Sequence, residues 1–372
     1  MSKRYSIFLS ALFCVFLGGV AVLSLLLPDK SFSPLENRYL QNPPKLSLET
    51  LGSGEFMEDA EKYVSDHIAG RDFWVAAKAW SERLSGKKES NGVYFGAQDT
   101  LINRVDTPSQ AKLDKDMGYL DTLVGNMSVP VYFGLIPSAA EIWRDRLPAG
   151  APTADERAVI DQLYFSTGAS TIDMYGALEA HSEEDLYYRT DHHWTSLGAF
   201  YGANAILEAM GLEPLELDSY QKATVTDQFY GTSFSTSGVR WLPPDSIDTY
   251  VPEDGVKVTS YFSGSPEEGS LYVDSKLEVK DKYAYFLGGN QPLCVIQNPD
   301  APDGKLLVIR DSYSDSLAPF LAEQFQEVHL FDLRYNNMSV QQYVADNGID
   351  QVLVLYSVAN FSTDMNLFKL AH

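Results

Sequence analysis

The chain has 372 residues, of which 45% are hydrophobic and 21% charged, and this composition is typical of a globular protein. Its formal net charge of -23 argues against nucleic acid as a partner and against non-specific attachment to anionic lipid or an anionic wall polymer, because such binding requires basic patches. The two cysteines, Cys14 and Cys294, are too few for a cysteine-based zinc site.

The N-terminus has the pattern of a membrane-spanning segment. Lys3 and Arg4 precede an uncharged apolar run over residues 5–27, which is long enough to cross a bilayer as one helix. The basic side predicts a cytoplasmic N-terminus, a single pass through the cell membrane and an extracytoplasmic C-terminal body. A cleaved signal peptide is the alternative, but the sequence around Leu25 to Pro28 offers no clean cleavage site. We expect residues 1–27 to be a retained anchor.

The segments that follow the anchor differ in character. Residues 28–52 contain four prolines and are expected to form an extended tether. Residues 53–86 place apolar side chains at helical spacing, and residues 92–102 have the pattern of a β-hairpin. Beyond them the pattern predicts helices over 108–126, 154–166 and 196–211, and strands over 129–137 and 170–175.

Residues 212–280 are rich in Pro, Gly, Ser, Thr and Asp, and they predict an irregular insertion with a few strands. After it, strands are expected over 305–310, 327–334 and 351–357, and helices over 314–325 and 339–347. Strands that alternate with helices predict an α/β fold with three α/β/α layers and a mostly parallel sheet. We expect residues 53–372 to form this domain.

Ser312 follows a predicted buried strand directly and precedes a predicted helix. A side chain at this position lies at the carboxyl edge of a parallel sheet, near backbone N–H groups that could stabilise an oxyanion. The alternative is that Asp311, Ser312 or Ser314 merely caps the helix.

A second cluster of polar residues lies in "TDHHWT", residues 190–195. A serine is a weak nucleophile without a base. His193 could supply the base and Asp191 the carboxylate that orients it. Asp191, His192 and His193 could instead bind a metal, but adjacent histidines point apart and no motif offers a further ligand, so we predict no metal. In the third interpretation, Thr190 or Asp191 caps the following helix.

"TDHHWT" together with Ser312 in a strand–turn–helix resembles the DHHW family of exported bacterial proteins. More distantly, the chain is similar to the SGNH-like domains of the alginate O-acetyltransferases. Further matching segments occur in the same order over nearly the whole exported body: "SPLENRYL" (33–40), "DHIAGRD" (66–72), "GVYFGAQDTLI" (92–102), "IPSAAEIW" (136–143) and "FLGGNQPL" (286–293). The resemblance implies an SGNH-hydrolase-like catalytic domain.

The resemblance also implies roles for individual residues. The acetyltransferase relatives carry an Asp-x-His pair before the serine in the chain, which implies Ser312 as nucleophile, His193 as base and Asp191 as its orienter. The remaining candidates are expected to form the oxyanion hole or contact substrate: Gly289 and Asn290, with Asn360 as second choice for the oxyanion hole, and Arg189, His192 and Tyr313. For Arg189, pairing with an acidic neighbour is the alternative.

The expected function is O-acetylation of a cell-envelope or secreted polysaccharide through a serine acyl-enzyme. The implied partners are the polysaccharide acceptor and a separate multispanning membrane-bound O-acyltransferase that passes the acetyl group outward. No cofactor is expected. Two alternatives remain open: a carbohydrate esterase (deacetylase) with the same triad, and a non-catalytic glycan-binding or scaffold subunit of an envelope assembly.

Overall fold

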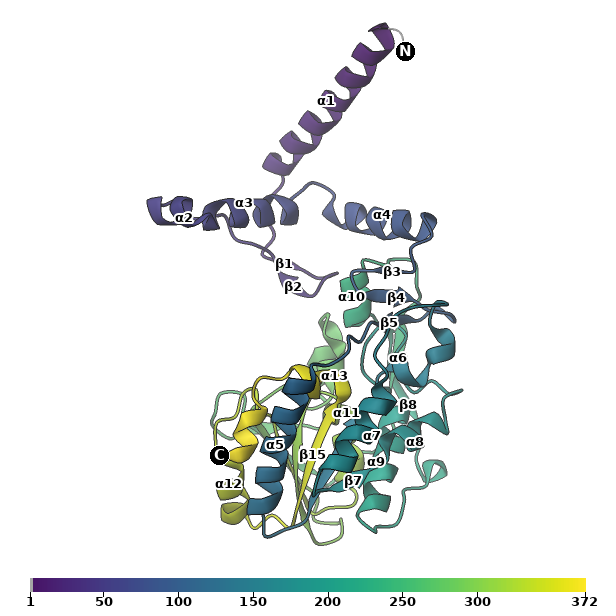
Figure 1. The fold of residues 1–372 in the computed structure, drawn as a ribbon, viewed down its shortest axis with the longest axis vertical. Coiled ribbons are helices and arrows are strands. Elements are labelled where there is room, and N and C mark those ends of the chain that lie inside the picture. Colours follow the sequence, from purple (N-terminus) through teal and green to yellow (C-terminus); the bar gives the residue numbers. More distant parts are fainter. Residues whose placement is uncertain (1–2) are drawn as a thin grey trace. The chain divides into compact units, whose positions relative to one another are not determined.

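The computed structural model describes residues 3–372, which divide into two compact units (Figure 1). Unit 1 contains the described residues up to Asn91 together with Ser235–Trp241, and unit 2 contains Gly92–Phe234 and Leu242–His372. The predicted domain boundary at residue 53 therefore lies inside unit 1. Residues 1 and 2 of the predicted anchor lie outside the described residues.

Unit 1 begins with α1 (Lys3–Leu26), a helix long and apolar enough to cross a membrane. The expected tether contains a two-stranded sheet and a short helix, so it is only partly extended. Gly70 is the N-cap of the helix that begins at Arg71, and its φ of 72° is a left-handed conformation that glycine adopts without strain. The remaining elements of unit 1 are β1 (Phe32–Ser33), β2 (Arg38–Tyr39), α2 (Leu48–Ser53), α3 (Glu55–Asp66), α4 (Arg71–Leu84) and β3 (Glu89–Ser90).

Unit 2 is built on an eight-stranded sheet in the order β11-β10-β12-β14-β13-β15-β6-β7. The strands from β14 to β7 pair in parallel, whereas β11, β10 and β12 are antiparallel to their neighbours. The strands of this sheet are β6 (Val131–Ile136), β7 (Ser170–Ile172), β10 (Lys257–Ser260), β11 (Glu267–Gly269), β12 (Leu293–Gln297), β13 (Lys305–Arg310), β14 (Glu327–Phe331) and β15 (Gln351–Ser357).

The expectation of a mostly parallel sheet is wrong, because the sheet is mixed. Only residues 298–304 connect β12 to β13, and only residues 261–266 connect β10 to β11. A parallel arrangement requires a crossover of about a dozen residues or more, so such short connections favour antiparallel strands. Strands β10 and β11 belong to the expected insertion, and they extend the main sheet instead of standing apart from it.

Helices cover both faces of the sheet, so the three α/β/α layers are present (Figure 1). Alternate residues of β13 point to opposite faces, with Leu306 and Val308 on one side and Leu307 and Ile309 on the other. The first face packs against α8 (Met174–Glu179), α9 (Ser196–Ala209) and α11 (Ser314–Leu321). The second packs against α5 (Gln110–Asn126), α7 (Glu156–Ser166), α12 (Val340–Asn347) and α13 (Val358–Thr363).

Smaller elements complete unit 2. The expected hairpin is present as an antiparallel pair of β4 (Val93–Phe95) and β5 (Leu101–Asn103). The insertion also contains a second antiparallel pair, β8 (Ala223–Phe229) with β9 (Asp245–Thr249). It contains α10 (Thr232–Ser237) as well, of which the first residues belong to unit 2. Short helices add α6 (Ala139–Ile142), η1 (Arg144–Arg146), η2 (Leu217–Ser219), η3 (Asp274–Glu278), η4 (Lys282–Tyr285) and η5 (Leu367–Ala371).

Candidate active site

The Asp191–His193 pair is arranged locally, in the loop that precedes α9. Asp191 Oδ1 lies 2.6 Å from His193 Nδ1 and also accepts the His193 backbone N–H at 3.0 Å. These two bonds to one carboxylate oxygen fix both the backbone and the ring of His193. Only 3% of Asp191 and 5% of His193 is exposed, so little water competes for these hydrogen bonds.

Ser312 occupies the turn between β13 and α11, as the strand–turn–helix pattern predicts. Asp311 holds this turn: its Oδ1 accepts the Tyr313 N–H at 3.0 Å, and its Oδ2 accepts the N–H and the hydroxyl of Ser357, both at 2.8 Å. Ser357 ends the neighbouring parallel strand β15. Asp311 therefore attaches the serine turn to the carboxyl edge of the sheet.

The structure brings the pair and the serine together, although 119 residues separate His193 from Ser312 in the chain. His193 Nε2 lies 2.7 Å from Ser312 Oγ. With Nδ1 directed at Asp191, the imidazole joins the hydroxyl to the carboxylate in the order that a Ser-His-Asp triad requires. The predicted convergence of Asp191, His193 and Ser312 is thus confirmed as geometry.

Helix capping does not account for either cluster. Helix α9 begins after Thr195, whose side chain accepts the Gly198 N–H, so neither Thr190 nor Asp191 is its N-cap. Helix α11 begins after Tyr313 and has no side-chain cap. The residues of both clusters are therefore available for other contacts.

The Asp191 carboxylate is stabilised as an anion. Burial alone would raise its pKa, but the two neighbouring imidazoles and the hydrogen bonds hold the pKa of Asp191 well below its usual range. Its second oxygen accepts the N–H of Thr232 at 2.6 Å and the hydroxyl of Thr232 at 2.8 Å. A Cβ at Gly231 would lie 2.2 Å from Asp191, so glycine is needed there for this approach. The insertion thus supplies the support behind the orienting carboxylate.

His192 lies beside His193, with 3.8 Å between the ring centroids. Its Nδ1 is 2.6 Å from the Thr232 hydroxyl, and a third of its side chain is exposed. Enclosure by protein atoms and then the neighbouring His193 lower the pKa of His192 to about 4, so this ring is neutral at pH 7. The Tyr313 hydroxyl donates to the His192 carbonyl, so it connects the serine turn to the loop that carries Asp191 and His193.

Tyr283 is a further residue of the site, and the sequence analysis did not identify it. Its ring stacks on His193 with 3.8 Å between centroids and 9° between planes. Its hydroxyl donates to the Ser312 carbonyl at 3.1 Å and lies 3.0 Å from Ser316 Oγ. Tyr283 belongs to η4 and no recognisable motif surrounds it, so only the tertiary structure reveals this contact.

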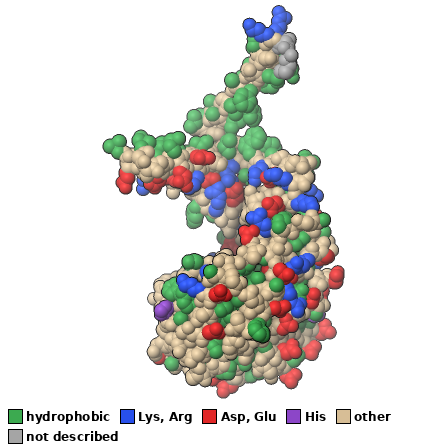
Figure 2. Space-filling model, in the orientation of Figure 1, with side chains coloured by type: hydrophobic (Ala, Val, Ile, Leu, Met, Phe, Trp, Pro, Cys, Tyr) green, Lys and Arg blue, Asp and Glu red, His purple; other side chains and the backbone are tan. Residues whose placement is uncertain are grey.

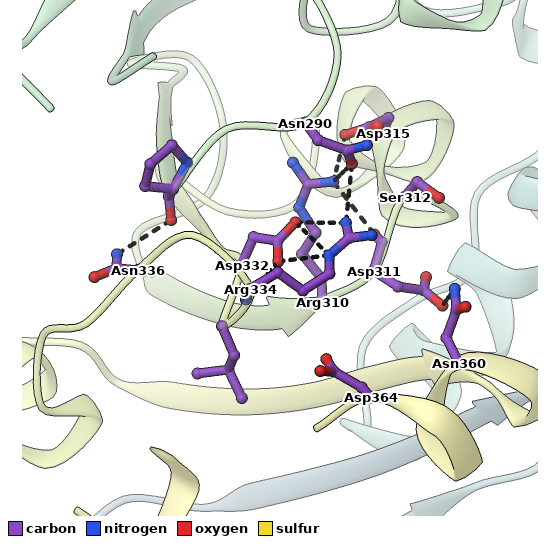
Figure 3. Close-up of polar contacts among 12 residues, drawn as sticks. Asn290, Arg310, Asp311, Ser312, Asp315, Asp332, Arg334, Asn336, Asn360 and Asp364 are labelled. Atoms are coloured by element: carbon purple, nitrogen blue, oxygen red, sulfur yellow. Dashed lines mark hydrogen bonds and ion pairs between the residues drawn. The ribbon is translucent and has the colours of Figure 1, made fainter. Parts of the chain in front are cut away.

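Asn290 and Asn360, which are predicted for the oxyanion hole, make side-chain contacts within the protein (Figure 3). Asn290 accepts from Arg334 at 3.0 Å and from Arg310 at 3.4 Å, and the Ser312 side chain points away from this group in Figure 3. Asn360 donates its amide to Asp311 Oδ2 at 2.8 Å, which makes it a support of the serine turn. Gly289 has a φ of 103°, so a turn explains this glycine.

Arg189 has the alternative role stated for it. Its Nε bonds Asp245 Oδ1 at 3.1 Å and its Nη2 donates to the Pro244 carbonyl at 2.9 Å. The same carboxylate accepts the backbone N–H groups of Arg189 and Thr190. This ion pair holds the start of the Asp-His loop against β9.

The distances among Asp191, His192 and His193 would allow a metal ion, but the hydrogen bonds of these residues do not favour one. One ligand atom from each of Asp191, His192 and His193 lies within 4.8 Å of the others. Yet both oxygens of Asp191, Nδ1 of His192 and both ring nitrogens of His193 already have protein partners. The arrangement fits a Ser-His-Asp triad better than the ligands of a metal ion.

A DHHW protein family model matches residues 118–331, more than half of the chain and both parts of the triad. The chain belongs to the DHHW family. A DHHW family protein from Eubacterium siraeum is 26% identical in sequence, with a TM-score of 0.66, over 76% of this chain and 95% of that one. The resemblance stated from the sequence is confirmed.

Two further solved structures match this chain at lower sequence identity. PatB1 from Bacillus cereus, with a sulfonyl adduct, is 23% identical with a TM-score of 0.62, and the match covers 74% of this chain and 98% of that one. The O-acetyltransferase domain of Pseudomonas putida AlgJ is 13% identical with a TM-score of 0.44, over 73% and 93%. No curated protein matches the sequence.

Proposed function

We propose that this DHHW protein is a membrane-anchored O-acetyltransferase that acts on a cell-envelope or secreted polysaccharide through an acyl-enzyme on Ser312. The observation that carries the proposal is the continuous chain of contacts from Asp191 through His193 to Ser312, at 2.6 and 2.7 Å. This geometry activates a serine for acyl transfer. The sulfonyl adduct described for PatB1 fits a nucleophile in the shared fold, because sulfonyl reagents react with activated nucleophiles.

In the proposed first step, Ser312 Oγ attacks the acetyl carbonyl carbon while its proton moves to His193 Nε2. The donor oxygen then leaves with that proton, and acetyl-Ser312 remains. In the second step a sugar hydroxyl attacks the acyl group, gives its proton to His193 and releases Ser312 with the proton restored. Asp191 keeps the imidazole in the required tautomer and stabilises its charged form.

The donor and the compartment belong to the same proposal. Helix α1 would hold the catalytic unit on the extracytoplasmic side, and a multispanning O-acyltransferase would present the acetyl group there. The length and apolar composition of α1 support the anchor.

The decisive experiment is intact-protein and peptide mass spectrometry after brief incubation with an activated acetyl ester. We expect one added acetyl group on the Ser312 peptide and none in Ser312→Ala. An oligosaccharide series then separates the two enzyme reactions, since a transferase moves acetyl groups to sugar hydroxyls as acceptor rises. Free acetate as the sole product at every acceptor concentration would favour the esterase. Absence of acyl-serine with several donors would contradict an enzymatic role and favour the scaffold.

A further inference from the structure

Helices α2, α3 and α4 of unit 1 expose an unusual number of large apolar side chains. The exposed fractions range from 38% for Trp74 to 92% for Leu48. The set, here called the apolar face, consists of Leu48, Leu51, Met57, Val64, Phe73, Trp74, Trp80 and Leu84. Figure 2 shows hydrophobic side chains along the edge of α2 and α3 from which α1 departs, and acidic side chains along the opposite edge.

The helical spacing shows that these exposures are not scattered. Met57 and Val64 lie two turns apart on one side of α3, while the ion pair of Glu58 and Lys62 lies on the other. Such a division between an apolar and a charged side is the pattern of a helix that lies in a membrane interface.

Helix α4 repeats this pattern independently. Phe73, Trp80 and Leu84 follow each other at helical spacing and are 65%, 44% and 81% exposed. The residue of α4 that is packed inside unit 1 is Ala79, only 1% exposed, on a different side of the helix. Trp80 also packs on Trp241 of unit 1, with 4.3 Å between ring centroids. Phe73 and Leu84 extend the exposed stripe on either side of this contact.

Two residues of α1 contact the segment that carries the apolar face. Ser24 Oγ of α1 accepts the Ala69 N–H at 2.8 Å, between α3 and α4. Phe16 of α1 meets Trp74 of α4 edge to face, with 6.0 Å between centroids. A tryptophan beside a spanning helix is typical of the interfacial zone of a bilayer.

The distribution of charge between the units supports a lipid partner. Unit 1 has 12 Lys and Arg residues against 11 Asp and Glu, whereas unit 2 has 16 against 40. The strong negative charge of the chain therefore belongs to unit 2, and unit 1 is close to neutral. Electrostatic repulsion does not keep the apolar face away from an anionic membrane.

We propose that α2, α3 and α4 lie in the extracytoplasmic interface of the bilayer, with the apolar face against the lipid and the charged sides in water. This inference rests on the proposed anchoring of α1. Unit 1 is then held by the spanning helix α1 at its start and by the lipid contacts of α2, α3 and α4 along its length. These contacts fix unit 1 on the membrane surface instead of leaving it on a flexible tether.

The test uses the full-length chain in vesicles of phosphatidylcholine and phosphatidylglycerol. Single spin labels are placed on Val64→Cys and Leu84→Cys in a Cys14→Ala background, with Lys62→Cys and Lys78→Cys as matched controls on the charged sides. Cys294 is buried, so the background should take up little label. Power saturation measures collisions with oxygen, which enriches in lipid, and with a nickel chelate, which stays in water.

We expect the labels at Val64 and Leu84 to collide several-fold more with oxygen and less with the chelate than those at Lys62 and Lys78. Equal access to the chelate at all four positions would overturn the inference. Protection of Val64 and Leu84 from both reagents would also overturn it, since a protein partner would then cover the face. A label on native Cys14 reports the anchor separately: if it is in lipid while Val64 is in water, only this inference fails.

Discussion

The ring of Tyr283 stacks on His193 while its hydroxyl bonds the Ser312 carbonyl, so one side chain from η4 contacts both the catalytic imidazole and the serine turn. The sequence predicted Asp191, His193 and Ser312, because their chemistry is tied to a short motif and to a strand–turn–helix. It could not predict Tyr283, which gains its role only from tertiary packing. Asn290 and Asn360 stay predictions for the oxyanion hole, and only the structure shows that Asn290 accepts from Arg334 and that Asn360 donates to Asp311.

Replacement of the relay residues gives the first prediction. Ser312→Ala should lower the turnover of a small acetyl ester by on the order of 10⁴-fold or more, since it removes the covalent route. His193→Ala should lower the turnover nearly as much, and His192→Ala should lower it far less. Steady-state kinetics checks this, and thermal unfolding should show that the melting temperature of Ser312→Ala changes by only about a few degrees. Full activity of Ser312→Ala would contradict the assignment.

Tyr283 gives a second prediction. Tyr283→Phe keeps the stacked ring and loses the hydroxyl contacts, which should lower kcat by about 3- to 10-fold, the usual range for one hydrogen bond. Tyr283→Leu also removes the stacking on His193 and should lower kcat further. KM should stay near its original value in both variants, because Tyr283 acts through His193 and Ser312. A change confined to KM would mean that Tyr283 binds substrate instead.

Among the elements, the strands and helices of the C-terminal half were predicted well because their apolar runs are short, regular and separated by turns. The direction of the strands was not, since periodicity says nothing about which neighbour a strand finds. The direction could have been inferred from the lengths of the connections 298–304 and 261–266, because both are too short for the crossover that parallel strands require. A prediction that weighs connection length would have placed β12 antiparallel.

Helix α7 begins with a carboxyl that should make stability depend on pH. Glu156 is fully buried, and burial raises its pKa to about 7 even though it accepts hydrogen bonds from the N–H and hydroxyl of Ser138. Unfolding returns the pKa to about 4.5, so between these values the folded chain holds more protons than the unfolded one. The contribution of Glu156 to the free energy of unfolding must therefore fall as pH rises from about 4.5 to 7.

The third prediction follows from this sign. Glu156→Gln should remove a pH dependence on the order of 3 kcal/mol across that window, because one pKa unit corresponds to about 1.4 kcal/mol. Urea unfolding of the variant and the original protein at several pH values measures the difference. Asp161→Asn, on the exposed side of the same helix, should leave the pH dependence as it was. Parallel curves for Glu156→Gln and the original would contradict the raised pKa.

For the whole molecule, the division of charge and apolar surface between the units distinguishes the part assigned to the membrane from the part assigned to chemistry. The apolar run over residues 5–27 was recognised from composition alone, because hydrophobic length is a property of the sequence. The extent of unit 1 was not, since residues 235–241 join it from a distant place in the chain.

The fourth prediction concerns the retained anchor. In membranes from cells that produce the full-length protein, detergent should extract it and alkaline carbonate should not, because α1 spans the bilayer. Intact mass should include residues 5–27. A shorter mass that begins after residue 27, with release into the soluble fraction, would show that the segment is a cleaved leader.

The location of Asp191 and His193 only two positions apart has a consequence for how activity is lost. Their mutual geometry is set by a short loop, so it survives moderate disturbance of the fold, and a single separation remains for the tertiary structure to maintain. That separation, between the loop and the serine turn, is bridged by Trp194 donating to the Tyr313 carbonyl and by Tyr313 donating to the His192 carbonyl. Inactivation should therefore occur when the loop with Asp191 and His193 separates from the serine turn. We expect it to be complete at denaturant concentrations where the helices that follow them, α9 and α11, are still formed.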